Sequence, residues 1–220
     1  ITFSFSGFSQ RAGITGEHTD GWGVAFFEGI STKADVSGQV PSVADKGLRL
    51  FIDNHAASDS PIADLIRQYP IKSRTVVAHI RKATQGVVAL QNCHPFVREL
   101  WGHYWVFAHN GNLENYHPRL HSHFLPVGDT DSERAFCWLM QEIAKAHAAM
   151  PSVAELTCTL SELVPQIAQH GTFNLLLSNG TALWAHASTE LHYLVRQHPF
   201  STAVLSDENM QVNFADLTQP

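Results

Sequence analysis

Segments with strand character lie on both sides of two adjacent helical segments in this chain. Before the helices, short apolar runs of strand type occur at 23–28, 48–52, 74–80 and 104–108. The helical segments, 131–148 and 153–169, have apolar residues at helical spacing. After them, expected strands at 173–177 and 182–187 flank Asn179-Gly180, a dipeptide preferred in hairpin turns, and 191–196 is a further expected strand. This order predicts an α+β fold with two sheets packed face to face and helices outside, although other α+β arrangements fit the same order.

The region that follows the first expected strand is harder to interpret. Residues 29–60 are polar and punctuated by Gly and Pro, which is typical of a long surface excursion, and only 48–52 has strand character there. A short helix over 61–69 follows, with Ser60 as its cap and Pro61 in its first turn.

Composition and charge exclude several classes of protein. A length of 220 residues suits one domain with a substantial core, although two small domains also fit. The net charge is -6 and the 14 Lys and Arg residues are scattered, which argues against a nucleic-acid partner. No apolar run is long enough to span a membrane, and the first residues do not resemble a signal peptide. Three cysteines are too few for a disulfide framework and favour a reducing cytoplasm.

Four segments concentrate Gly, His and polar residues beside expected strands: HTDGWG at 18–23, AHIRKATQG at 78–86, AHNGNL at 108–113 and GDTDSE at 128–133. In the second, Arg81 and Thr84 follow an apolar strand. Arginine can bind a planar carboxylate through two parallel hydrogen bonds. The alternative is an ordinary surface arginine paired with an acid.

The third and fourth motifs also have two interpretations each. Asn110 and Gly111 could aim an amide donor and a backbone N–H at one point, as an oxyanion hole requires, or they could form a hairpin turn. Thr130 and Glu133 have the spacing of a helix capping box, which places Asp131 in the first helical turn. Asp131 could receive the ammonium group of a ligand there, and both roles can hold together.

Taken in order, these motifs resemble the class II glutamine amidotransferases, most closely their stand-alone glutaminase domains. The resemblance runs from DGWG through FNLLLSNG to the PF at 199–200. It implies a four-layer αββα sandwich of the N-terminal nucleophile hydrolase type. It also implies that Arg81 binds the α-carboxylate of glutamine beside Thr84, that Asp131 binds its α-ammonium group, and that Asn110 and Gly111 form the oxyanion hole.

The nucleophile of that family is a cysteine exposed as the first residue of the mature chain, and its own α-amino group acts as the base. Ile1 has no nucleophilic atom. Cys93 is the only cysteine near the motifs, whereas Cys137 and Cys158 fall in expected helices and fit small buried hydrophobic residues. We therefore expect 1–220 to be one amidotransferase domain that lacks its catalytic N-terminal segment and its last strands. As printed, it should bind glutamine without turning it over.

The fourteen histidines also suggest a metal, above all His117, His121 and His123. That segment is a polar loop, whereas zinc sites need ligands on a firm scaffold, so we expect no metal and no cofactor. His79 and His109 stand at strand ends, where a hydrogen-bonded structural role is favoured over catalysis. They and the segment from His18 to Trp22 are expected to line the site.

The expected function is hydrolysis of L-glutamine to glutamate and ammonia through a γ-glutamyl thioester, in the cytoplasm. No synthetase domain is present in these 220 residues, so the ammonia could pass to a protein partner. Two alternatives remain open: hydrolysis of a γ-glutamyl conjugate or peptide, and binding of an amino acid without catalysis.

Overall fold

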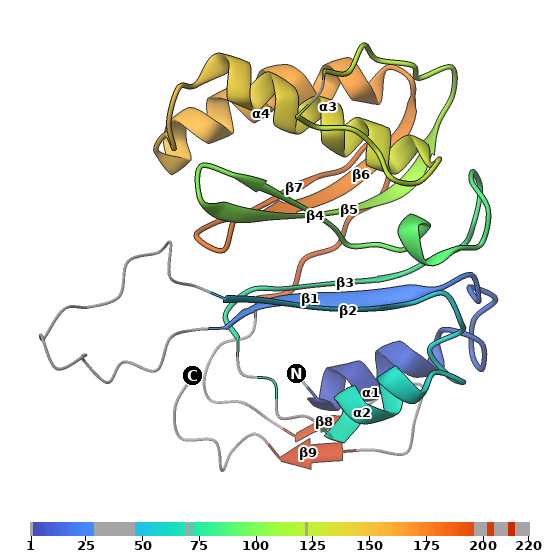
Figure 1. Ribbon diagram of the computed structural model, residues 1–220. Coiled ribbons are helices and arrows are strands. Elements are labelled where there is room, and N and C mark those ends of the chain that lie inside the picture. Colours follow the sequence, from blue (N-terminus) through green and yellow to red (C-terminus); the bar gives the residue numbers. More distant parts are fainter. Residues whose placement is uncertain are drawn as a thin grey trace, which may run out of the picture.

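The computed structural model describes residues 2–28, 47–68, 71, 73–121, 123–195, 202–204 and 211–213. Figure 1 shows four layers, in which two sheets lie face to face and a pair of helices covers the outer face of each sheet. The strand orders are β2-β1-β3 in one sheet and β4-β5-β6-β7 in the other. The pairings within both sheets are antiparallel. The expected αββα sandwich is therefore confirmed.

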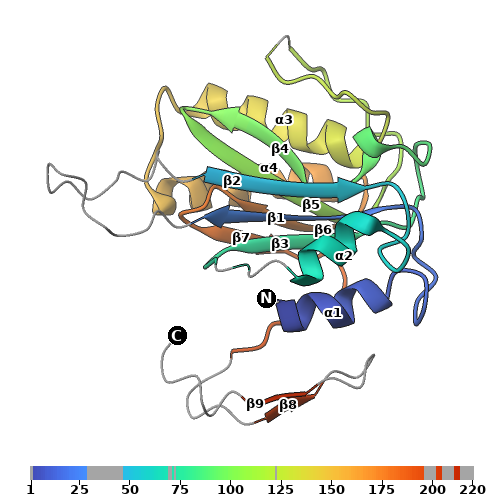
Figure 2. The same ribbon diagram turned by 60° about the horizontal axis from the view of Figure 1, so that its bottom comes forward.

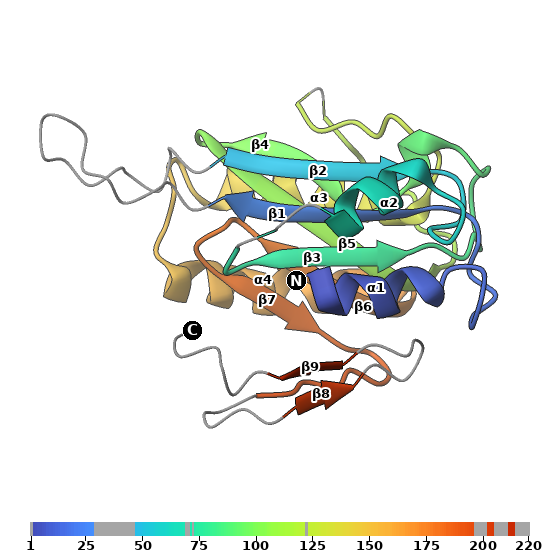
Figure 3. The same ribbon diagram turned by 90° about the horizontal axis from the view of Figure 1, so that it is seen from below.

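The first sheet contains β1 (Trp22–Glu28), β2 (Gly47–Asp53) and β3 (Val76–Ile80). Its outer face is covered by α1 (Thr2–Gln10) and α2 (Pro61–Gln68), which Figure 2 shows obliquely and Figure 3 shows from below. The second sheet contains β4 (Phe96–Leu100), β5 (His103–Leu113), β6 (Gly171–Ser178) and β7 (Leu183–His186). It is covered by α3 (Asp131–Ala146) and α4 (Val153–Ala168). The remaining elements are the 3-10 turn η2 (Leu90–Asn92) and a separate pair of short strands, β8 (Thr202–Val204) and β9 (Gln211–Asn213).

Strand β1 is apolar from Trp22 to Phe27, and both of its faces are buried there. Val24 and Phe26 belong to the cluster beneath α1 and α2, whereas Ala25 and Phe27 belong to the cluster between the two sheets. Successive side chains of a strand point to opposite faces, so this alternation follows from the backbone. The continuous apolar run in the sequence therefore indicates a strand in the middle of a layered fold.

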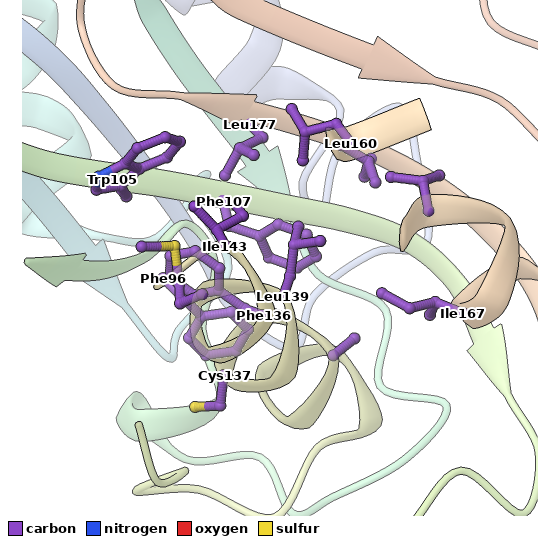
Figure 4. Close-up of a cluster of buried hydrophobic side chains, with 14 of the residues drawn as sticks. Phe96, Trp105, Phe107, Phe136, Cys137, Leu139, Ile143, Leu160, Ile167 and Leu177 are labelled. Carbon is purple, nitrogen blue, oxygen red and sulfur yellow. The ribbon is translucent and has the colours of Figure 1, made fainter. Parts of the chain in front are cut away.

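Strand β5 is likewise buried on both faces, in the second sheet. Trp105 and Phe107 face α3 and α4, while Val106 faces the first sheet. Figure 4 shows this core, in which the rings of Phe107 and Phe136 stack with their centroids 4.9 Å apart. Each such buried side chain contributes about 1.5–3 kcal/mol relative to an exposed one. This core holds β5, which carries part of the site, firmly against α3.

Several elements differ from the expectations. Helix α1 and strand β4 were not predicted, and α1 is held by Phe5, whose ring centroid lies 5.5 Å from that of Trp22. The strand expected at 191–196 is wrong over 191–195, where the chain is exposed and has no regular structure. Within the described part of the chain, no strand pairs with this stretch. Residues 29–46, 196 and 216–220, on which other expectations fell, lie outside the described residues.

Candidate active site

A cavity of about 360 Å³ lies at one end of the sandwich, between the two sheets and the start of α3. Its wall comes from the end of β3 and the loop after it, from β5, and from the first residues of α3 and β6. It is lined by His18, His79, Ile80, Arg81, Lys82, Thr84, Gln85, His94, His109, Asn110, Gly111, Asn112, Thr130, Asp131, Ser132 and Thr172.

This lining joins residues from motifs that are distant in the sequence. β3 and β5 belong to facing sheets, and the backbone N–H of Leu113 in β5 donates to Asp131 Oδ2 at 2.7 Å, which holds the start of α3 against the second sheet. The structure thereby brings together seven residues that the sequence motifs had singled out: His79, Arg81, Thr84, His109, Asn110, Gly111 and Asp131.

Trp22 does not line the cavity, so that expectation is corrected. Its side chain is fully buried beneath α1, where it packs against Phe5. The reason is the alternation of β1, because Trp22 shares the outer face with Val24 and Phe26. His18, from the same motif, does line the cavity.

Arg81 is buried, with 3% of its surface exposed, although arginine is mostly exposed in proteins. Its terminal nitrogens donate to backbone carbonyls of the loop that follows, at 3.0 Å to Gln85 and 3.2 Å to Val87. Among the described residues, no carboxylate forms an ion pair with it. The interpretation of Arg81 as a surface arginine paired with an acid is therefore wrong.

Asp131 is the first residue of α3 and is 4% exposed. Besides the bond from Leu113, its carboxylate lies 3.5 Å from the hydroxyl of Ser132. The helix N-terminus and the backbone N–H of Leu113 offset part of the cost of burying the charge. No cationic side chain in the described regions pairs with Asp131, so its carboxylate can take a ligand ammonium group.

The cap of α3 differs from the expected capping box. Thr130 Oγ1 accepts from the backbone N–H of Glu133 at 3.2 Å, as predicted. The carboxylate of Glu133 instead accepts from the backbone N–H groups of Val127 and Gly128, at 3.0 and 2.7 Å, and pairs with Arg98 at 2.5 Å. Glu133 therefore holds the loop before α3 in place, and this also positions Asp131 at the start of the helix.

Asn110 and Gly111 are strand residues, so the hairpin-turn interpretation is wrong. They pair with Asn174 and Phe173 of β6. A Cβ atom at Gly111 would overlap the carbonyl oxygen of Thr172, so only glycine lets β5 and β6 approach this closely. The side chain of Asn110 is exposed at the cavity wall. The two residues can therefore present an amide and a backbone N–H to one ligand atom, as an oxyanion hole requires.

His109 is a hydrogen-bonded structural residue. Its Nε2 lies 3.1 Å from the carbonyl oxygen of Thr172 and its Nδ1 lies 2.8 Å from the hydroxyl of Ser132. A carbonyl can only accept, so Nε2 carries the hydrogen and Nδ1 accepts from Ser132. Burial lowers the pKa of His109, although Thr172 and Asp131 act in the opposite sense. Both nitrogens are engaged by the protein, which leaves none for catalysis.

None of the three cysteines lines the cavity. Cys93 is 2% exposed, its sulfur lies 3.4 Å from the carbonyl oxygen of Asp53, and burial raises its pKa to about 11. Cys137 is buried in the core beneath α3, as expected, whereas Cys158 is exposed on α4, so the expectation that it is buried is wrong. A reactive thiol needs an accessible, electropositive environment that favours the thiolate. Cys93 is therefore not placed to act as a nucleophile.

Other lining residues were not singled out from the sequence, among them Gln85, Asn112 and Thr172. Gln85 Nε2 donates to Asn112 Oδ1 at 2.7 Å and to the carbonyl of Leu113 at 2.8 Å, which ties the loop after Arg81 to β5. Gln85 and Asn112 lie inside the polar motifs, so their residue types could have identified them. Thr172 could not be found in this way, because only the β5–β6 register places it opposite Asn112.

Among the described residues, no three His, Cys, Asp or Glu side chains cluster closely enough to hold a metal ion. His121 and His123 instead line a second cavity of about 490 Å³ beside α3. The helices of the described part are all too short or too polar to cross a membrane.

Comparison with known proteins agrees with this geometry. The family model for class II glutamine amidotransferases matches residues 1–220. A protein of Haemophilus influenzae named as a candidate glutamine amidotransferase is 50% identical over 216 residues, which cover 98% of this chain and 68% of that protein.

The similarly named YafJ of Escherichia coli is 44% identical over 221 residues, covering 100% of this chain and 80% of YafJ. The crystal structure of a predicted glutamine amidotransferase from Pseudomonas aeruginosa matches with a TM-score of 0.69 and 40% identity, over 92% of this chain and 73% of that one. These matches span nearly the whole chain, and the chain therefore belongs to the class II glutamine amidotransferases.

Proposed function

We propose that the protein binds L-glutamine in this cavity and hydrolyses its side-chain amide to glutamate and ammonia. The observation that carries the proposal is a buried cation and a buried anion, Arg81 and Asp131, on the wall of one cavity and without an ion pair between them. Each buried charge is stabilised by a partner of opposite sign. A zwitterionic α-amino acid supplies both partners at once.

In this proposal Arg81 and Thr84 bind the α-carboxylate, and Asp131 binds the α-ammonium group. The terminal nitrogens of Arg81 hold the carbonyls of Gln85 and Val87, so a bidentate grip on a carboxylate exchanges some of these bonds and shifts the 85–87 loop. With both ends of the amino acid held, its side chain extends towards Asn110 and Gly111 on the same wall.

The proposed reaction has two steps. A cysteine thiolate attacks the amide carbon, and the oxyanion that forms is stabilised by Asn110 and the backbone N–H of Gly111. The amine that removed the thiol proton returns it to the leaving nitrogen, which departs as ammonia and leaves a γ-glutamyl thioester. Water then attacks the thioester, giving glutamate and the free thiol.

We propose that this thiol belongs to a cysteine exposed as the first residue of the mature protein, as the family resemblance implies. The positions of Cys93, Cys137 and Cys158 support this, because all three lie away from the cavity wall. The test is to label the native protein with an electrophilic glutamine analogue and to map the modified peptide. Modification of an N-terminal cysteine is expected, and label on Cys93 instead would refute the assignment.

The function itself is tested by measuring glutamate release from L-glutamine, where the leaving group is ammonia, and from γ-glutamyl peptides, where it is an amino acid or peptide. Release from glutamine is expected to be faster, and a preference for γ-glutamyl peptides would make conjugate hydrolysis the function. A third outcome, binding of the amino acid without turnover, would identify a binding module. For residues 1–220 this outcome is favoured by the cavity wall, which contains none of the three cysteines.

Three further points belong to this proposal. The αββα order of layers supports the N-terminal nucleophile hydrolase type. The three cysteines are free, which fits a cytoplasmic protein. The ammonia would be used by a protein partner. Adding such a partner should raise the amount of aminated product formed per molecule of glutamate released.

A further inference from the structure

Two side-chain amides, those of Gln85 and Asn92, connect the loop that follows β3 to the elements that hold Asp131. This loop spans residues 81–89, between β3 and η2. Within it, the guanidinium of Arg81 donates to the backbone carbonyls of Gln85 and Val87. Groups that hold the 81–89 loop in place therefore also hold one of the two charges of the cavity.

Gln85 forms the first bridge, from the 81–89 loop to β5. Its Nε2 donates to the carbonyl of Leu113 at 2.8 Å and to Asn112 Oδ1 at 2.7 Å. A carbonyl can only accept, which fixes the orientation of the Gln85 amide. Leu113 in turn donates its backbone N–H to Asp131 Oδ2. A hydrogen-bonded path through Gln85 and Leu113 therefore joins the two buried charges.

Asn92 forms the second bridge, from the 81–89 loop to the segment before α3. It is the last residue of η2 and is fully buried. Its Nδ2 donates to the carbonyl of Val87 at 2.9 Å and to Asp129 Oδ1 at 2.6 Å. Its Oδ1 accepts from the backbone N–H of Asp129 at 3.1 Å. Both hydrogens and the oxygen of this amide are thus used to join a carbonyl that binds Arg81 to a residue two positions before Asp131.

Close packing between the 81–89 loop and the segment before α3 supports the same connection. A Cβ atom at Gly86 would lie 2.5 Å from Asp129 Oδ1, and one at Gly128 would lie 3.1 Å from the carbonyl oxygen of Gln91. Gly86 also has a φ of +75°, which favours glycine. The two segments therefore meet directly, with no room for side chains at these two glycines.

We propose that Gln85 and Asn92 are positioning residues that set the separation between Arg81 and Asp131 and thereby select α-amino acids. This specificity role rests on the proposed function, in which the two charges bind the carboxylate and the ammonium group of one ligand. In an α-amino acid a single carbon atom joins these groups, so one separation of the charges suits both. A ligand with an additional methylene leaves one charge poorly paired unless the separation changes, and the two bridges resist that change.

The test is to compare dissociation constants for L-glutamine and L-β-homoglutamine, which has the additional methylene, in the wild type and in Gln85→Met. Methionine keeps the length of the side chain but has no donor. The wild type should prefer L-glutamine. Because the variant loses two hydrogen bonds of the bridge, it should bind L-glutamine about tenfold more weakly, equivalent to ~1.4 kcal/mol, and L-β-homoglutamine almost as before.

Gln85 lines the cavity, so an effect through Arg81 must be distinguished from direct contact with the ligand. Asn92 is not part of the cavity wall, and Asn92→Ala should lower the preference for L-glutamine in the same sense. In an Arg81→Lys background, Gln85→Met should cost much less than tenfold, because residues of one network are not additive. Fully additive losses would show direct contact and overturn the positioning role.

Gln166→Met on α4 is the matched control. Its Nε2 donates to the carbonyl of Glu162 on the outer layer, so both dissociation constants should stay unchanged. A purely structural role of the bridges would lower the thermal midpoint of Gln85→Met and leave its preference for L-glutamine unaltered, which would overturn the inference. A wild type without that preference would overturn it too. If the wild type binds neither amino acid, the proposed function fails instead.

Two provisions keep the comparison decisive. Gln85 is half-buried, so Gln85→Met should fold, and with the Arg81→Lys pair it decides the question if Asn92→Ala does not fold. If mass spectrometry of the recovered ligand shows turnover, the preference is measured from the inhibition constants of L-glutamate and L-β-homoglutamate against glutamine hydrolysis. The same loss of preference is expected there, and an unaltered ratio of inhibition constants would overturn the inference.

Discussion

Replacing Arg81 with lysine tests the centre of the proposed site. The guanidinium presents two parallel N–H groups to a carboxylate, whereas an ammonium group is a single charged point on a flexible chain. Lysine can therefore keep the charge and one hydrogen bond but loses the second, charge-assisted bond, which contributes about 1.5–3 kcal/mol. We expect glutamine binding to weaken by about 2 kcal/mol, roughly 30-fold in the dissociation constant.

Isothermal titration calorimetry with L-glutamine measures this loss directly. The same change removes bonds from Arg81 to the carbonyls of Gln85 and Val87, each contributing about 0.5–1.5 kcal/mol, so the thermal midpoint of the variant should also fall. Arg67→Lys on α2 is the control, because Arg67 pairs with Asp64 on the outer layer and should leave glutamine binding unchanged. An Arg81→Lys protein that is folded and binds glutamine as tightly as the wild type would exclude Arg81 from the site.

Three further predictions concern the cavity wall. Asp131→Asn keeps the shape of the side chain but removes the charge opposite the ligand ammonium group, so glutamine affinity should fall by at least ~2 kcal/mol in the same calorimetric assay; an unchanged affinity would place the ammonium group elsewhere. Gly111→Ala forces β5 away from the carbonyl of Thr172 and should lower the free energy of unfolding by about 1–3 kcal/mol, measured by urea denaturation. Burial lowers the pKa of His79 to about 4 from an ordinary 6.5, with the charge of His109 acting in the same direction and a hydrogen bond to the His109 backbone in the opposite one, so the unfolded chain binds a proton at a higher pH than the native protein does. The stability that neutral His79 contributes is thus complete above pH 6.5 and is lost as the pH falls towards 4, by about 3 kcal/mol in total; a His79→Gln protein should show a correspondingly flatter dependence of unfolding free energy on pH between these values.

Much of the site could be predicted because its chemistry lies in short motifs. Arg81, Asn110 and Asp131 each stand in a cluster of polar residues and glycines beside an apolar run, and these clusters occur in the order of a known family. The strands and helices were recognisable for a related reason: burial of both faces of β1 and β5 leaves continuous apolar runs, and burial of one face of α3 leaves a helical period in the sequence.

The sequence by itself indicated the family and the residues of the proposed amino-acid site, since both depend on short motifs and their order, and the order of the layers followed only through the resemblance to the family. Only the tertiary structure decided which side of β1 Trp22 occupies, that Asn110 and Gly111 continue a strand, and that Cys93 is buried against the carbonyl of Asp53 at the end of β2. It also placed Gln85 and Asn92 between the 81–89 loop and the elements that hold Asp131. These properties depend on strand register and on contacts between residues far apart in the chain, and no local spacing encodes them.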